Sequence, residues 1–242
     1  MTRATNARIA GFTLLFYIAV GVAGMILSGR VSRAGGTTER LASMAQHETE
    51  VRVSAVLGLL TGFVALALGM ALYAITREQD PDLAMLALTC RVGEGVMAGI
   101  FIPMTLGLLS LATADGANTP DAAAANVIGS FVMTVRRWNP IIAATFFAVG
   151  SALFSWLLLR GRMIPVALAW LGVLASVLLV VGLPLQLAGF LRGPATQLMW
   201  IPMAAFEIPL GLWLLVKGVA MPPILQSRPG HTEGAHACPT AQ

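Results

Sequence analysis

The fold is decided by stretches such as VSAVLGLLTGFVALALGMALYAIT, which runs from Val53 to Thr76 without a charged residue. An α-helix of about 20 apolar residues crosses the ~30 Å hydrocarbon core of a bilayer. Comparable apolar runs recur along the chain, which has 242 residues, 57% of them hydrophobic and only 11% charged. Soluble domains carry about 25% charged residues. The sequence therefore predicts an all-α fold, a polytopic membrane helix bundle.

The hydropathy pattern predicts six transmembrane helices in a single domain over residues 1–220, with a disordered C-terminal tail over 221–242. The predicted spans are about 9–28, 53–76, 83–113, 140–159, 164–190 and 196–218. Two longer connections, between the first and second and between the third and fourth spans, lie on one side of the membrane.

The second long connection carries the signals of a helix of its own. Thr119 is suited to the N-cap and Pro120 to the first helical position. Apolar residues then fall on one helix face: Val127, Ile128, Phe131, Val132 and Val135. This pattern predicts a short interfacial helix near residues 120–137, lying on the membrane surface. The alternative is that the fourth span begins early, and residues 37–52 could likewise extend the second span.

The lysines and arginines are divided evenly between the two sides, so the positive-inside rule alone gives no orientation. The compact basic turn RGR at 160–162 favours a cytoplasmic location for the tight turns, and hence for both termini. The net charge of +4 is spread over helix ends. Anionic membrane lipid explains it better than nucleic acid, which we do not expect as a partner.

Three ionisable residues lie well inside the predicted spans: Arg91 and Glu94 in LTCRVGEGVMAG (88–99), and Glu207 in IPMAAFEIPLGLWLLVKG (201–218). A charge at the bilayer centre costs at least ~2.5–3.5 kcal/mol. Arg91 and Glu94 are three residues apart and share a helix face. At ~1.5 Å rise per residue, Glu94 and Glu207 reach a similar depth. We expect the third and sixth spans to pack together, with Arg91 bridging both carboxylates.

The surroundings of these charges are rich in glycine and proline. The pairs Gly58–Gly62 and Gly95–Gly99 fit the small-xxx-small pattern of closely packed membrane helices. Gln186 adds a polar group beside Pro184, and breaks at membrane depth are tolerated where they line a cavity. The candidate binding residues are therefore Arg91, Glu94, Glu207 and Gln186, while the glycines are candidate packing residues.

Four segments occur in a recognisable order: ARIAGFTLLFYIAVGVAG, the R-x-x-E of Arg91 and Glu94, RGRMIPVALAWLGVL, and IPMAAFEIPLGLWLLVKGV. In them the chain resembles an uncharacterised family of bacterial six-helix integral membrane proteins, domain-of-unknown-function family 4386. The resemblance covers about 7–219, and its closing segment is the most specific part. It implies six spans and a bacterial plasma membrane, and it implies no activity.

Familiar catalytic and cofactor motifs are missing from the sequence. No histidine lies in a predicted span, where a haem or metal centre would need one. Cys90 and Cys238 are placed too differently to form a disulfide, and burial in hydrocarbon opposes a reactive thiolate at Cys90. We therefore expect no metal and no cofactor, and the sequence names no catalytic residue.

Three functions are compatible with the sequence. In the first, a mid-membrane Arg/Glu pocket binds or translocates a small amphipathic or cationic molecule, or couples to protons. In the second, the protein is an accessory or scaffold subunit that docks to a larger membrane protein complex, or forms a homodimer, through its glycine-rich helices. In the third, it is an intramembrane enzyme that modifies lipid or isoprenoid with the glutamates as acid and base. Purely architectural use of the charges is the alternative to all three.

Overall fold

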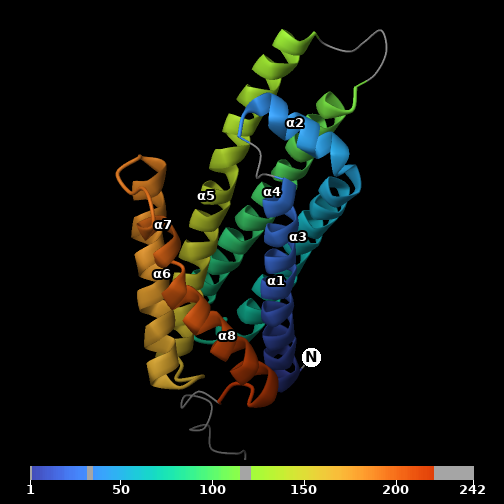
Figure 1. Cartoon of the computed structure of the whole chain (residues 1–242). Helices are drawn as coiled ribbons and strands as arrows, with labels where there is room; N and C mark the ends of the chain where they lie inside the picture. Colours follow the sequence, from blue (N-terminus) through green and yellow to red (C-terminus); the bar gives the residue numbers. More distant parts are fainter. Residues whose placement is uncertain (1, 32–34, 115–120, 221–242) are drawn as a thin grey trace, which may run out of the picture.

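The computed structural model describes residues 2–31, 35–114 and 121–220, and within them the chain forms helices and no strands (Figure 1). The helices are α1 (Arg3–Val31), α2 (Thr37–Gln46), α3 (Glu48–Thr76), α4 (Pro81–Ala112), α5 (Ala122–Arg160), α6 (Val166–Leu187), α7 (Ala195–Leu198) and α8 (Ile201–Val216). Six segments are long and apolar enough to cross a membrane, and the last of them combines α7 with α8. The predicted all-α bundle of six spans is confirmed. The predicted tail, 221–242, lies outside the described residues.

Residues 122–137 are the first turns of α5 and not a separate helix on the membrane surface. The N-cap is Asp121, whose Oδ1 accepts a hydrogen bond of 2.7 Å from the backbone N–H of Ala124. Four alanines follow, and Ala is the strongest helix former. The chain then continues through Pro140 as one helix of 39 residues. At ~1.5 Å per residue this helix is about twice as long as the hydrocarbon core is thick. Thr119 and Pro120, the predicted helix start, lie outside the described residues.

The first long connection contains α2, and α3 extends the second span only as far as Glu48. His47 separates the two helices with non-helical backbone angles (φ −114°, ψ 38°). Leu41 and Met44 on one side of α2 are buried against α3 and α4, where they contact Val51 and Leu108. α2 therefore lies across one end of the bundle (Figure 1).

The six spans form a closed ring in the order α1, α3, α4, α5, α6 and α8, because α8 packs against both α6 and α1. The expectation that the third and sixth spans pack together is therefore not met. The third span, α4, packs between α3 and α5, so that α4 and α8 are separated by two helices on either side of the ring.

Glycines allow the closest approaches in this ring. A Cβ on Gly62 of α3 would lie 3.4 Å from the carbonyl oxygen of Gly95 in α4. A Cβ on Gly11 of α1 would lie 2.6 Å from the carbonyl oxygen of Gly211 in α8, so these two helices cross with their backbones almost in contact. Small residues bring membrane helices close enough for extensive van der Waals packing.

Candidate functional site

A buried ion pair on α4 forms the centre of the polar cluster. The Nη1 of Arg91 donates to the Oε2 of Glu94 over 2.7 Å, one helical turn away. Arg91 is 2% exposed and Glu94 is 5% exposed. The guanidinium also lies 4.7 Å above the ring centroid of Phe147 on α5, a favourable cation–π geometry. The i, i+3 spacing thus produces a pair that needs only one helix to form.

Two further side chains tie this pair to neighbouring helices. The hydroxyl of Tyr17, on α1, donates to the Oε1 of Glu94 over 2.5 Å. The Nη2 of Arg91 donates to the Oγ of Ser151, on α5, over 3.4 Å. The carboxylate of Glu94 therefore has a charged donor on one oxygen and a phenol on the other. Charge-assisted bonds of this kind are about twice as strong as neutral ones.

Glu207 lies on α8 and is only 9% exposed, yet among the described residues its carboxylate has neither a hydrogen bond nor an ion pair. The expectation that Arg91 bridges both acids is therefore not met. Arg91 reaches Glu94 by the short path along its own helix, whereas Glu207 comes from a helix on another part of the ring. Both acids nevertheless line one cavity.

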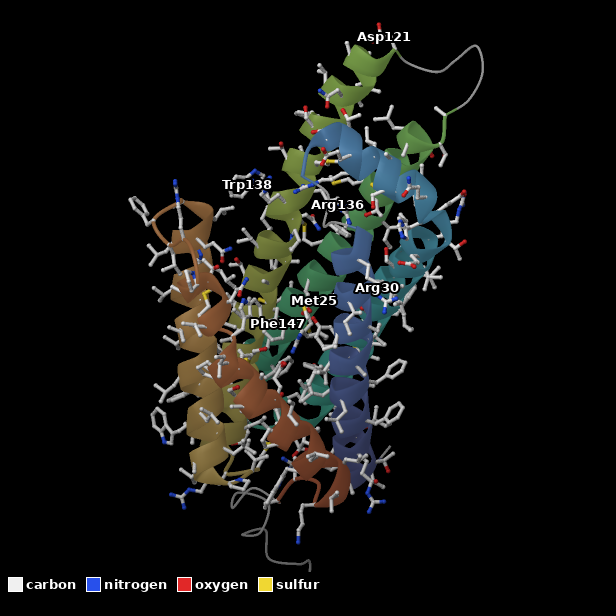
Figure 2. All side chains as sticks on the ribbon, viewed as in Figure 1. Met25, Arg30, Asp121, Arg136, Trp138 and Phe147 are labelled. Atoms are coloured by element: carbon white, nitrogen blue, oxygen red, sulfur yellow. The ribbon has the colours of Figure 1, made fainter. Side chains whose placement is uncertain are left out.

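This central cavity has a volume of about 420 Å³. Its walls come from α1, α3, α4 and α5, and from Trp200 and Glu207 on the sixth span. The polar lining consists of Tyr17, Ser28, Ser54, Thr61, Glu94, Thr105, Asn139 and Glu207. The remaining lining is apolar and includes three aromatic rings besides Tyr17, from Phe101, Phe147 and Trp200. In Figure 2 Phe147 lies between α5 and α1, at the level of this cavity. Pockets for small molecules have this size and this mixture of apolar walls with a few polar groups.

A much smaller void of about 20 Å³ lies beside the central cavity, since Glu207 lines both. Its other polar lining comes from Arg91, Ser151 and Ser155. A void of this size has room for about one water molecule. The cation of Arg91 and the carboxylate of Glu207 thus face a common space without touching.

The predicted glycines differ in their surroundings. Gly58, Gly62 and Gly95 line the central cavity, and Gly62 and Gly95 are also in mutual contact. A Cβ on Gly99 would meet nothing within 4 Å. Gln186 lies at the C-terminal end of α6 and does not line the central cavity or the void next to it. The cluster therefore brings together Arg91, Glu94 and Glu207, without Gln186.

Several site residues were not singled out from the sequence: Tyr17, Asn139, Phe147 and Ser151. Tyr17 had a usable signal, because a tyrosine near the middle of a span needs a hydrogen-bond partner for its hydroxyl. Asn139 had one too, and its Nδ2 donates to the carbonyl oxygen of Met97 over 2.9 Å, linking α5 to α4. Phe147 and Ser151 resemble ordinary packing residues, and nothing in their spacing points to Arg91.

The described residues contain no group of three or more His, Cys, Asp or Glu side chains that could hold a metal ion. Cys90 is a buried free thiol on α4. Nothing in this part of the chain offers the donor set of a metal centre.

Comparison with known proteins identifies a family but no activity. The chain is not significantly similar to any curated protein or any solved structure. The family described as "Domain of unknown function (DUF4386)" matches residues 9–218, which span the whole ring of six helices. The buried Arg91–Glu94 pair and Glu207 all lie within the matched region. The protein is therefore a multi-pass membrane protein that belongs to the DUF4386 family.

Proposed function

We propose that the protein binds a small amphipathic cation in the central cavity, with Glu207 as the counter-ion. The observation that carries this proposal is the unpaired carboxylate of Glu207, which is buried and lines a cavity of about 420 Å³. A buried carboxylate without a hydrogen bond or a touching cation costs several kcal/mol, and Arg91 faces Glu207 only across the small void. A cationic ligand removes that cost and gains the attraction of the carboxylate.

The walls of the cavity suit the rest of such a ligand. The aromatic rings of Tyr17 and Trp200 offer apolar area and, through their faces, attraction for a cation. Arg91 does not compete for the ligand's place, because its guanidinium is held by Glu94 and Phe147. The ion pair thus keeps Glu94 bound to Arg91, while Glu207 stays available to a cationic ligand.

Proton coupling follows from the same arrangement. Without the ligand, protonation of Glu207 removes the unpaired charge, and a bound cation replaces that proton. Binding and proton release are then linked, which is a property that a transporter or a sensor can use. The scaffold and enzyme hypotheses gain less from the geometry. A docking surface has no need of a buried unpaired acid, and Glu94 is committed to Arg91 and Tyr17.

We place the protein in the bacterial plasma membrane with both termini in the cytoplasm. The support is the basic turn at 160–162, which lies at the same end of the bundle as Arg3 and Lys217. Labelling of single cysteines introduced at exposed positions such as Arg160 and Arg192 tests this orientation, because a reagent that does not cross the membrane reaches only one of the two from outside.

The binding proposal is tested with tetraphenylphosphonium, a lipophilic cation, by calorimetry on protein in phosphatidylcholine nanodiscs, with empty nanodiscs as background. Glu207→Gln keeps the shape of the side chain and removes its charge, and we expect at least a tenfold loss of affinity. Asp82→Asn is the matched control, since Asp82 is an exposed acid in the first turn of α4. Equal affinity in wild type and a folded Glu207→Gln protein would refute the proposal.

A further inference from the structure

A second cavity of about 240 Å³ adjoins the central one, on the side where α2 crosses the bundle. The two cavities share five lining residues: Ser28, Ser54, Phe101, Thr105 and Pro140. Three arginines line the second cavity, Arg40 of α2 and Arg136 and Arg137 of α5, and its lining in the described part of the chain contains no acidic residue. We call this space the arginine vestibule.

Acidic side chains pair with several arginines near the ends of the spans. Arg3 is paired with Glu78, Arg52 with Glu48, and Arg160 with Asp80. Neither Arg136 nor Arg137 is paired with a carboxylate of the described residues. Arg136 and Arg137 thus both line a cavity whose described lining holds no carboxylate.

Arg136 is also held in place. Its guanidinium lies 4.5 Å above the ring centroid of Phe101 on α4, and the side chain is half-buried. In Figure 2 Arg136 points into the bundle, whereas Trp138 on the same helix points away from it. Stacking uses the face of a guanidinium and leaves its N–H edge free, and that edge fits two oxygens of a phosphate or a carboxylate.

The position of the vestibule defines the kind of molecule that fits. Phe101, which supports Arg136, follows Glu94 by seven residues on α4, a rise of about 10 Å. Between these levels the wall of the central cavity is mostly apolar, and Gly21 and Gly24 of α1 present bare backbone with no neighbour within 4 Å of an added Cβ. A ligand whose anionic group lies at the arginines would therefore need an apolar part that runs along this wall towards Glu94.

We propose that the arginine vestibule binds the phosphate, or an equivalent oxyanion, of an amphiphile whose apolar part occupies the central cavity. If the proposed function also holds, the ligand is zwitterionic, with its cationic end at Glu207 and its anionic end in the vestibule. Only the cationic end rests on the proposed function. The anionic end rests on the vestibule alone.

Three probes separate the two ends, each titrated by calorimetry into the full-length protein in nanodiscs of digalactosyldiacylglycerol, a lipid that carries neither a phosphate nor an ammonium group. Decylphosphonate carries only the anion, decylammonium carries only the cation, and 8-aminooctylphosphonate carries both on a chain that spans the two levels. The double variant Arg136→Gln/Arg137→Gln removes the vestibule's cations. The matched control is Arg192→Gln, an exposed arginine near the same end of the bundle whose Nε donates to the carbonyl oxygen of Gly189.

We expect the double variant to bind decylphosphonate at least tenfold more weakly, while Glu207→Gln and Arg192→Gln leave that affinity unchanged. We expect the bifunctional probe to bind more tightly than either simple one and to lose affinity in both the double variant and Glu207→Gln. If the folded double variant keeps its affinity for decylphosphonate, the proposed anion site in the vestibule is overturned. If Glu207→Gln loses affinity for decylammonium but not for decylphosphonate, that result bears only on the proposed function.

Two further arms identify the source of the anion. If inorganic phosphate binds as tightly as decylphosphonate, the proposal that the ligand is an amphiphile is overturned, because a soluble anion is then sufficient. If phosphatidylglycerol in the nanodisc displaces decylphosphonate from wild type and not from the double variant, the natural amphiphile is a membrane lipid.

Discussion

Arg91→Gln is the perturbation whose effect on stability can be worked out most fully. The change removes the 2.7 Å ion pair with Glu94 and the cation above Phe147. Glu94, only 5% exposed, keeps the hydroxyl of Tyr17 as a partner and loses its counter-charge. Arg91 also links α4 to α5 through Phe147 and Ser151, so the change weakens the packing between these two neighbours in the ring.

The magnitude follows from comparing three variants. Removing one partner of a buried ion pair costs about 3–5 kcal/mol. Interhelical hydrogen bonds in membrane proteins average only ~0.6 kcal/mol and reach ~1.7, because the unfolded chain also finds partners in the membrane. We therefore expect about 3 kcal/mol for Arg91→Gln and about 1.7 for Tyr17→Phe, whose acceptor is charged. Ser151→Ala should cost no more than ~0.6 kcal/mol, since its bond to Arg91 is 3.4 Å long.

The assay is the free energy of unfolding in mixed micelles, titrated with sodium dodecyl sulfate and followed by circular dichroism. The double variant Arg91→Gln/Glu94→Gln removes both charges and should recover more than half of the loss, because position 94 then no longer carries a buried charge that has lost its counter-charge. The reasoning is refuted if Arg91→Gln is no less stable than Ser151→Ala, or if the double variant is less stable than Arg91→Gln.

Two further predictions concern stability. Gly11→Ala should destabilise the protein by about 1–3 kcal/mol, because its Cβ would lie 2.5 Å from the backbone nitrogen of Leu215. The control Gly99→Ala meets nothing within 4 Å and should be neutral or stabilising by up to ~1 kcal/mol. Equal losses in the same unfolding assay would contradict the described α1–α8 crossing. Glu207→Gln should stabilise the ligand-free protein by about 1 kcal/mol, since it removes an unpaired buried charge; a loss of stability would show that Glu207 has a partner in the protein.

The positions of the spans could be predicted from the sequence because each needs about 20 apolar residues, and this signal is strong. The Arg91–Glu94 pair was predictable because both residues lie on one helix, where a separation of three fixes their geometry. The similar depth of Glu94 and Glu207 was inferred from the rise per residue and stays a prediction, while the structure places both residues on one cavity. These three inferences depend only on distances along a helix.

The order of the helices around the ring was not predictable by the same reasoning. Lipid tails are as apolar as a leucine-rich core, so a membrane helix carries little sequence difference between its inner and outer faces. For this reason Glu207 could be assigned a depth but not a neighbour, and the pairing with Arg91 was inferred from charge alone. Tyr17 and Ser151 joined the cluster through helix packing, which no spacing within their own helices encodes.

The continuous α5 illustrates a different limit. The apolar face of residues 127–135 fits an interfacial helix, but Val127 and Phe131 are each 68% exposed in the structure, on a helix that continues without a break. A proline such as Pro140 within a span stops a helix only where its missing N–H and its ring cannot be accommodated. Whether it does so depends on the neighbours of α5 and not on its own sequence.

The central claim is that Glu207 is the counter-ion of a bound molecule, and native mass spectrometry tests it most directly. Wild type, Glu207→Gln and Asp82→Asn would be extracted gently from the membranes in which they are made. Wild type and Asp82→Asn should each retain a small cationic or zwitterionic molecule that is absent from folded Glu207→Gln. A wild-type protein that carries no small molecule, or a Glu207→Gln protein that carries the same one, would contradict the claim.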